Sequence, residues 1–366
     1  MLFLGLGLKE AVNSLRKDRD QMSNKLSRVL SCIQPTSEMH IGNYFGAVAN
    51  WVEMQESQSY ECIYGIVDLH AMTMPYEPSK LRENTERMII DLLACGINPD
   101  KSILFIQSLV PEHTELAWIL SCFCSYGELS RMTQFKEKSD LINEAAPDYF
   151  ISSGLFTYPV LQAADILIYL ADYVPVGKDQ EQHLELTRNI ARRFNSRFGD
   201  FFPEPAIKFT ESPKIMSPAD PEKKMSKSLG EKHYIGLFEE ETSIRNKIKT
   251  AVTDAGPGTL PPNVEMGAGV ANLFEILRAC GKKEEESFLT TKYKAGDLKY
   301  VELKDAAANA LVELTANLRV KRKEIESNKE VAYKTVWRMS EKAREIAAET
   351  LKEVRSRVGL SKKSKN

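Results

Sequence analysis

Two short segments of this sequence carry side chains that a phosphate-binding site needs. The first, His40-Ile41-Gly42-Asn43, follows a compact apolar run and stands where a helix is expected to begin. Gly42 lets a ligand approach the backbone, and the N-terminus of a helix favours negative charge. His40 and Asn43 add hydrogen-bond donors where a polyphosphate would lie. A match of this length also fits an ordinary helix start, so the segment alone does not decide between the two.

The second segment, Lys224-Met225-Ser226-Lys227-Ser228, lies far along the chain, after a loop marked by prolines. Two lysines that flank a serine suit a loop that closes over phosphate groups. Taken alone, this segment also fits a solvated basic loop. The order and separation of the two segments are therefore more informative than either one.

The elements that must position these segments alternate between strands and helices. Residues 29–33, 62–67 and 103–106 are short buried runs typical of strands. Helices are expected from 40–43 past Trp51 and from Pro78 to Gly96. Such alternation predicts an α/β fold with a parallel sheet and crossover helices.

The second half of the chain changes character. A helix is expected over 161–170, a short strand over 173–176 and a helix over 179–198, followed by a loop region rich in proline up to Pro221. After Gly269 almost everything has helical periodicity. The sequence therefore predicts an α/β domain followed by a helical one.

The two motifs resemble the HIGH and KMSKS signatures of the class I aminoacyl-tRNA synthetases. Further segments resemble the bacterial and mitochondrial type of tryptophanyl-tRNA synthetase: 34–36, 42–44, 68–71, 131–136, 157–159, 163–167, 174–177, 179–180, 183 and 185–188. The resemblance covers Arg28 to the C-terminus and implies a Rossmann-type parallel sheet. The chain departs from the bacterial pattern at Ser37, Asn43, Gln162, Lys178 and Leu229, and Lys178 alters the charge near the nucleotide.

The resemblance implies that ATP and tryptophan react to form an adenylate. The tryptophan carboxylate is already ionised at neutral pH, so the rate must come from positioning and from stabilising phosphate charge. The implied catalytic residues are Asn43, Lys136, Lys224 and Lys227, with Mg²⁺ bound through the phosphates and no metal site of the protein itself. The implied ATP-binding residues are Gln34, His40, Gly42, Asn43, Gly177, Asp179, Lys224, Met225, Ser226 and Lys227.

Asp165 is the key residue of the implied tryptophan site. It would accept a hydrogen bond from the indole N–H, the polar group of that ring. Its neighbours in the sequence are apolar, and a buried acid needs a partner; an arginine beside the helix is the structural alternative. The other implied tryptophan-binding residues are Gln34, His70, Tyr158, Gln162 and Gln180.

Charge and the resemblance together suggest the partners. Residues 319–366 carry a net charge of +8, whereas residues 1–318 carry −10, which suggests a polyanion contact near the C-terminus. We expect residues 28–235 to form the catalytic domain and 236–366 a helical domain that binds tRNA(Trp). The resemblance further implies a homodimer.

Residues 1–27 are expected to be an N-terminal extension. Basic residues outnumber acidic ones there, and Leu4, Leu8, Val12 and Leu15 recur at helical spacing. This pattern fits a mitochondrial import signal, which would place the protein in the matrix. Because Glu10, Asp18 and Asp20 oppose it, a plain N-terminal helix or extension on a cytoplasmic protein stays the alternative. No apolar run reaches the roughly 18 residues that a membrane span needs.

Three other functions compete with this interpretation. Tyrosyl-tRNA synthetase shares the fold and both signatures, but 174–180 and 163–167 favour tryptophan. A non-catalytic paralogue that binds RNA would have lost the phosphate-binding motifs, which are intact. Another HIGH-containing nucleotidyltransferase would lack the long helical part after Lys227.

Overall fold

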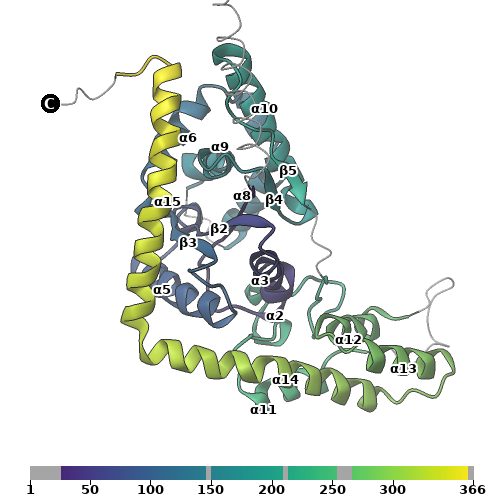
Figure 1. Cartoon of the computed structure of the whole chain (residues 1–366). Helices are drawn as coiled ribbons and strands as arrows, with labels where there is room; N and C mark the ends of the chain where they lie inside the picture. The colour runs from purple at the N-terminus through teal and green to yellow at the C-terminus, as the bar shows by residue number, and fades with distance from the viewer. Residues whose placement is uncertain (1–25, 146–149, 209–212, 254–265, 362–366) are drawn as a thin grey trace, which may run out of the picture.

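A five-stranded parallel sheet forms the centre of the molecule, with strand order β3-β2-β1-β4-β5. The computed structural model describes residues 26–145, 150–208, 213–253 and 266–361 (Figure 1). The strands are β1 Ser27–Ile33, β2 Tyr60–Ile66, β3 Ser102–Ile106, β4 Tyr173–Pro175 and β5 Ala206–Lys208. The predicted α/β fold is confirmed.

Helices cover both faces of the sheet. Successive side chains of each strand point to opposite sides, so each strand contributes to a core on either face. On one face, residues such as Val29, Tyr64 and Leu104 join a core with α3 (Ala49–Glu56) and α5 (Pro78–Ala94). On the other face, Leu30 and Phe105 join a core with α6 (Glu112–Ser121), α9 (Ser153–Ile168) and α10 (Glu181–Phe198). Strands buried on both faces explain the continuous apolar runs of the sequence.

The first motif lies between β1 and α3. His40 is the N-cap of α2 (Ile41–Asn43), which continues through a π-helical turn, Tyr44–Val48, into α3. The predicted helix from His40–Asn43 past Trp51 is therefore present, with one wider turn inside it. Its N-terminus faces the end of β1, where a ligand can reach it.

Two elements differ from their predicted extent. Helix α9 begins at Ser153 rather than near Leu161 and contains Pro159. Strand β5 falls in the stretch that its prolines mark as a loop. It is a three-residue edge strand directly after Pro205, a place where proline costs no ladder hydrogen bond.

The C-terminal helices form an angled arm (Figure 1). Helices α11 (Glu241–Lys249), α12 (Ala268–Ala279), α13 (Lys283–Lys294) and α14 (Tyr300–Ser327) lie together at one end of the molecule. Helix α15 (Lys329–Arg357) turns back along edge strand β3, where Ile106 N donates to Ser340 Oγ at 3.0 Å. Within the predicted helical domain, 236–366, α15 joins the core on one face of the sheet, where Ala343 and Ala347 pack with residues of α6, α9 and α10.

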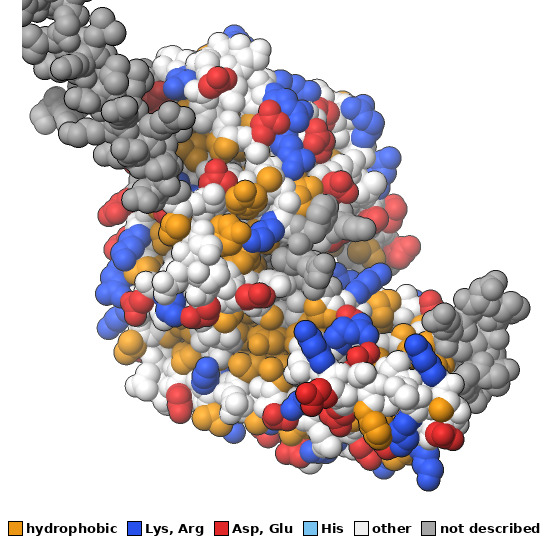
Figure 2. All heavy atoms as spheres, turned by 45° about the vertical axis from the view of Figure 1, so that its right-hand side comes forward, with side chains coloured by type: hydrophobic (Ala, Val, Ile, Leu, Met, Phe, Trp, Pro, Cys, Tyr) orange, Lys and Arg blue, Asp and Glu red, His pale blue; other side chains and the backbone are white. Residues whose placement is uncertain are grey.

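The remaining α-helices of the described part are α4 Asp68–Ala71, α7 Tyr126–Ser130 and α8 Thr133–Ala145. Short 3₁₀ helices lie at Gln107–Leu109, Lys178–Gln180, Lys227–Leu229 and Glu231–His233. Basic and acidic side chains are mixed over the face seen in Figure 2, and hydrophobic side chains gather in the hollow above the helical end. Among the residues described, no helix is long and apolar enough to span a bilayer.

Candidate active site

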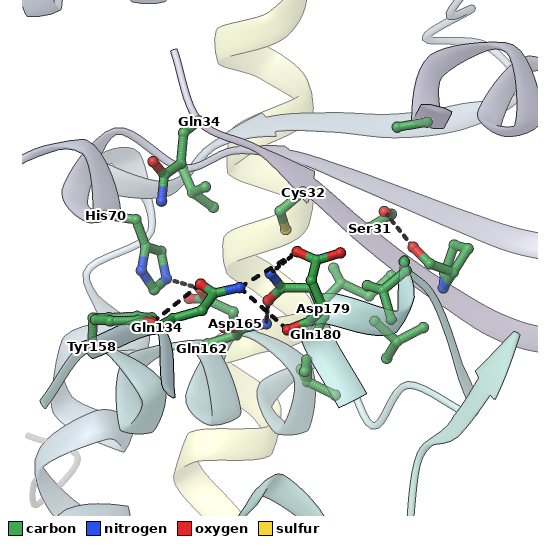
Figure 3. A pocket seen from close by; sticks show the side chains of 18 of the residues that line it. Ser31, Cys32, Gln34, His70, Gln134, Tyr158, Gln162, Asp165, Asp179 and Gln180 are labelled. Atoms are coloured by element: carbon green, nitrogen blue, oxygen red, sulfur yellow. Dashed lines mark hydrogen bonds and ion pairs between the residues drawn. The ribbon is translucent and has the colours of Figure 1, made fainter. Parts of the chain in front are cut away.

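A pocket of about 340 Å³ opens where β1 and β4 end (Figure 3). Ligands of open parallel sheets bind at the carboxyl ends of the strands. The pocket is lined by side chains from β1 and the loop after it, from α4, α8 and α9, and from the segment before α10. Six of these are the residues that the sequence assigned to tryptophan: Gln34, His70, Tyr158, Gln162, Asp165 and Gln180.

Asp165 lies at the base of this pocket, 3% exposed. His70 Nε2 lies 2.7 Å from its Oδ2, and His113 Nδ1 lies 2.5 Å from its Oδ1. Gln107 Nε2 donates to both oxygens, at 2.7 and 2.9 Å. Burial alone would raise the pKa of Asp165, but the hydrogen bonds from His113 and His70 outweigh it and lower the pKa to about 2. The group is therefore a carboxylate at neutral pH, paired with histidines and glutamine rather than with arginine.

Gln107 and His113 are site residues that sequence reasoning missed. Gln107 follows the end of β3 directly, and His113 is a fully buried residue of α6 whose Nε2 lies 2.8 Å from the Tyr169 hydroxyl. Their common signal was a polar side chain at the end of, or soon after, a buried strand. His70, Gln107 and His113 make four hydrogen bonds to the carboxylate, which has roughly four acceptor positions, so a further donor from the pocket would take the place of one of the two bonds from Gln107.

The polar wall of the pocket combines neutral side chains with Lys138 and Asp179. The Tyr158 hydroxyl lies 2.9 Å from His183 Nε2, and Gln162 Nε2 donates to Gln180 Oε1 at 3.3 Å. Burial and the charge of Lys138 lower the pKa of His183 to about 4, so its ring is neutral. Lys138 lies 4.4 Å from the centre of the Tyr158 ring. Amide and hydroxyl groups of this kind can hold an ammonium group or a carboxylate.

A second pocket, of about 300 Å³, lies beside the first motif and shares Gln34 with the pocket above Asp165. His40, Asn43, Ser226 and Lys227 also line it, so the two signature motifs meet there. Asn43 N donates to His40 Nδ1, and His40 N donates to Asn43 Oδ1, both at 3.2 Å. This capping box leaves the His40 Nε2–H and the Asn43 amide NH₂ as donors for a ligand.

Electrostatics in the second pocket favour an anion. Burial, Lys227 and Lys224 lower the pKa of His40 to about 4, so the ring is a neutral donor. Lys227 Nζ lies 3.3 Å from Ser37 Oγ, and burial lowers the pKa of this lysine to about 8. A phosphate group would supply the negative charge that this buried ammonium lacks.

Backbone pairing holds the first motif against residues 235–237, which follow the second motif in the chain. Ile41 N donates to Ile235 O at 3.0 Å, and Leu237 N donates to Met39 O at 2.9 Å. Met225 is buried, and its Cβ lies 3.6 Å from the place that a Cβ on Gly42 would occupy. Segments far apart in the sequence are thereby fixed at one end of the sheet.

Some assigned residues lie outside the second pocket. Gly177 and Asp179 line the first pocket, and a Cβ on Gly177 would come 2.6 Å from Asp179 Oδ1, so any other residue there would displace the Asp179 side chain. Lys224 is exposed and lines neither pocket. The side chain of Lys178 lies outside the described residues.

Lys136, like Lys224, lines neither pocket. It is exposed on α8, whereas Lys138 and Gln134, one helical turn apart, both line the first pocket. A position two residues away lies on another side of a helix. Lys138 is therefore the lysine of this segment that lines the first pocket, whereas the role of Lys136 on the triphosphate stays a prediction, as it does for Lys224.

Comparisons with known proteins agree with this geometry. The family model tRNA synthetases class I (W and Y) matches residues 22–316. The chain is 44% identical over 346 residues to tryptophan–tRNA ligase 2 of Streptomyces avermitilis, covering 93% of this chain and 98% of that protein.

Solved structures of tryptophanyl-tRNA synthetases are also similar. That of Mycoplasma pneumoniae has a TM-score of 0.78 at 34% identity, covering 92% of this chain and 98% of the other. That of Campylobacter jejuni, complexed with ADP and tryptophan, has a TM-score of 0.76 at 33% identity, covering 91% and 100%. The chain therefore belongs to the class I tRNA synthetases and, within them, to the bacterial-type tryptophanyl-tRNA synthetases.

Proposed function

We propose that this chain activates L-tryptophan with ATP and transfers the amino acid to the 3′ end of tRNA(Trp). The observation that carries the proposal is the ionised, buried Asp165 at the base of one pocket, with Lys227 and the first motif in the adjoining pocket. Gln34 borders both pockets. An indole N–H on Asp165 would place the carboxylate end of the amino acid toward the phosphates.

In the activation step, a carboxylate oxygen of tryptophan attacks the α-phosphorus of ATP and pyrophosphate leaves. Gln34, Tyr158 and Gln180 orient the two charged groups of the amino acid. The His40 Nε2–H, the Asn43 amide and the Lys227 ammonium bind phosphate oxygens, and Lys224 joins them when its loop closes. Fixed donors of this kind stabilise the charge that develops in the transition state.

Mg²⁺ is the metal that such phosphates carry. The residues around the second pocket suit it, since Glu38, Ser226 and Ser228 offer oxygen ligands there. When bound, Mg²⁺ neutralises charge on the phosphates. Among the residues described, no group of three or more His, Cys, Asp or Glu side chains is placed to hold a metal ion, so the nucleotide would supply most of the ligands.

The partner surfaces follow from charge and exposure. Basic α15 and the helical end would contact tRNA(Trp).

Trp118 on α6 and Tyr126 on α7 are 75% and 77% exposed, and both helices pack on α9. Large exposed aromatic side chains mark protein interfaces, so we place a homodimer contact on this side. Sedimentation of Trp118→Glu beside the unchanged protein would measure it, and an unaltered mass would contradict this placement.

The proposed location is the mitochondrial matrix, with the cytoplasm as the alternative. What supports it is the basic, amphipathic pattern of residues 1–27, which lie mostly outside the described part. A fusion of residues 1–40 to a fluorescent protein is expected to enter mitochondria. A matched fusion in which Leu4, Leu8, Val12 and Leu15 become serine should stay outside, because it loses the apolar face. Diffuse signal from the first fusion would contradict import by this segment.

ATP–pyrophosphate exchange across all twenty amino acids tests the proposed reaction. Tryptophan is expected to support exchange far better than tyrosine or phenylalanine. Exchange that follows tyrosine, or that no amino acid supports, would refute the proposal.

A further inference from the structure

The ring of Tyr234 lies beside His40 and Lys227, which line the second pocket, and beside Lys247. Lys227 Nζ is 5.3 Å from the ring centre, and Lys247 Nζ is 4.5 Å from it. The His40 ring lies 6.4 Å away, tilted by 47°. Tyr234 therefore contacts both signature motifs, although neither motif includes it.

Lys227 is half-buried, and no carboxylate among the described residues is in contact with its ammonium group. The charge of Lys227 therefore needs another neighbour that stabilises it. Its hydrogen bond is to the neutral Ser37 Oγ. Glu38, Asp91 and Glu239 attract its charge from farther away, and Arg87 repels it. The face of an aromatic ring attracts a cation within about 6 Å, and more strongly where water is excluded.

Tyr234 is also held more firmly than the loop that carries Lys227. The next residues, Ile235 and Leu237, pair with the backbone on either side of His40. Behind the ring, Lys247 is bound to Glu239 at 2.5 Å, and the same carboxylate accepts from Gly236 N at 2.8 Å. The ring is thus fixed to the first motif, whereas Lys224, three residues before Lys227, is exposed.

We propose that Tyr234 is a positioning residue, whose ring holds the Lys227 ammonium at the wall of the triphosphate pocket before the nucleotide binds. Without the ring, Lys227 turns toward solvent, and ATP must pay the cost of ordering it again. This inference rests on the proposed function, because it assumes that ATP occupies the second pocket. Tyr234 itself touches no reacting atom.

Tyr234→Leu and Tyr234→Phe separate the ring from the hydroxyl. In exchange assays, the leucine variant is expected to raise KM for ATP by about 3- to 30-fold, which corresponds to the strength of a partly buried cation–π contact. KM for tryptophan should stay unchanged, and the phenylalanine variant should behave like the unchanged protein. Tyr60→Leu is the matched control, since it removes a ring 4.1 Å from Lys208, away from both pockets.

The pH dependence of kcat/KM for ATP is a second measurement. It should change if Tyr234 positions Lys227, but not if Tyr234 only stabilises the fold. Because burial is what lowers the pKa of Lys227, its turn toward solvent in the leucine variant raises that pKa, and the alkaline limb near 8 moves to higher pH. An unmoved limb, a normal KM for ATP, or equal damage by the phenylalanine variant would overturn the proposal. Tyr234→Met, also without a ring, serves if leucine prevents folding. If the unchanged protein itself shows no tryptophan-dependent exchange, the proposed function fails instead.

Discussion

Replacing Asp165 with alanine should lower kcat/KM for tryptophan steeply and that for phenylalanine only slightly. Tryptophan carries a ring N–H, and phenylalanine does not. A site built to accept that group can discriminate by on the order of 10⁴-fold, whereas shape alone gives far less. The preference of the variant should therefore narrow toward what the shape of the pocket provides.

The surroundings of Asp165 sharpen this expectation. His70, Gln107 and His113 all direct donors at the carboxylate, so its removal also leaves buried donors without a partner. Each such group costs about 1–3 kcal/mol, so a loss of stability will accompany the loss of specificity. Unfolding of each variant must be measured, and kinetics compared only below its transition.

Asp165→Asn is the matched variant, since it keeps the volume and an acceptor oxygen. Its uncharged oxygen makes a weaker bond, so we expect a similar but milder effect. The deciding measurement is the ratio of pyrophosphate-exchange efficiencies for tryptophan and phenylalanine, taken in the unchanged protein and in both Asp165 variants. An unchanged ratio would make Asp165 a structural residue of α9 and move recognition of the indole N–H elsewhere, with Gln162 the next candidate.

The sequence was sufficient where a local pattern determines the position of a side chain. Strands with continuous apolar runs were found, and so was the helix start at His40, since each depends on neighbouring residues. That Lys138 lines the first pocket was not predicted, because the side of α8 that faces the pocket depends on how that helix packs. Gln107 and His113 were missed because their partner, Asp165, lies far away in the sequence.

Tertiary packing also decided the place of α15. Its amphipathic sequence and basic charge predict a solvent-facing helix with one apolar side, but not which surface that side covers. The structure places Ser340 against the unpaired edge of β3, next to Gln107. A contact across this separation in the chain has no local signal, so a division into domains by composition could not include it.

Changing both Lys224 and Lys227 to alanine should slow adenylate formation strongly while leaving tryptophan affinity within a few-fold. Each lysine would act on the phosphates, and loss of one fixed donor to a developing charge typically costs about 10²- to 10³-fold. The structure separates the two residues: Lys227 already lines the second pocket, whereas Lys224 is exposed. Lys227→Ala should therefore raise KM for ATP as well as lower kcat, and Lys224→Ala should act mainly on kcat, when the loop closes.

The pH profile gives this prediction an independent check. Lys227 must be protonated to bind phosphate, and burial lowers its pKa to about 8. In the free enzyme, kcat/KM for ATP should therefore be highest below pH 8 and fall as the pH rises through that value. Lys227→Ala should lack this alkaline limb, while Lys224→Ala should retain it. Lys223→Ala, at an exposed neighbour paired with Asp220, is the matched control and should change neither rate nor profile. Single-turnover activation at the normal rate in the double variant would remove both lysines from the chemistry and leave His40 and Asn43 as the groups that bind the phosphates.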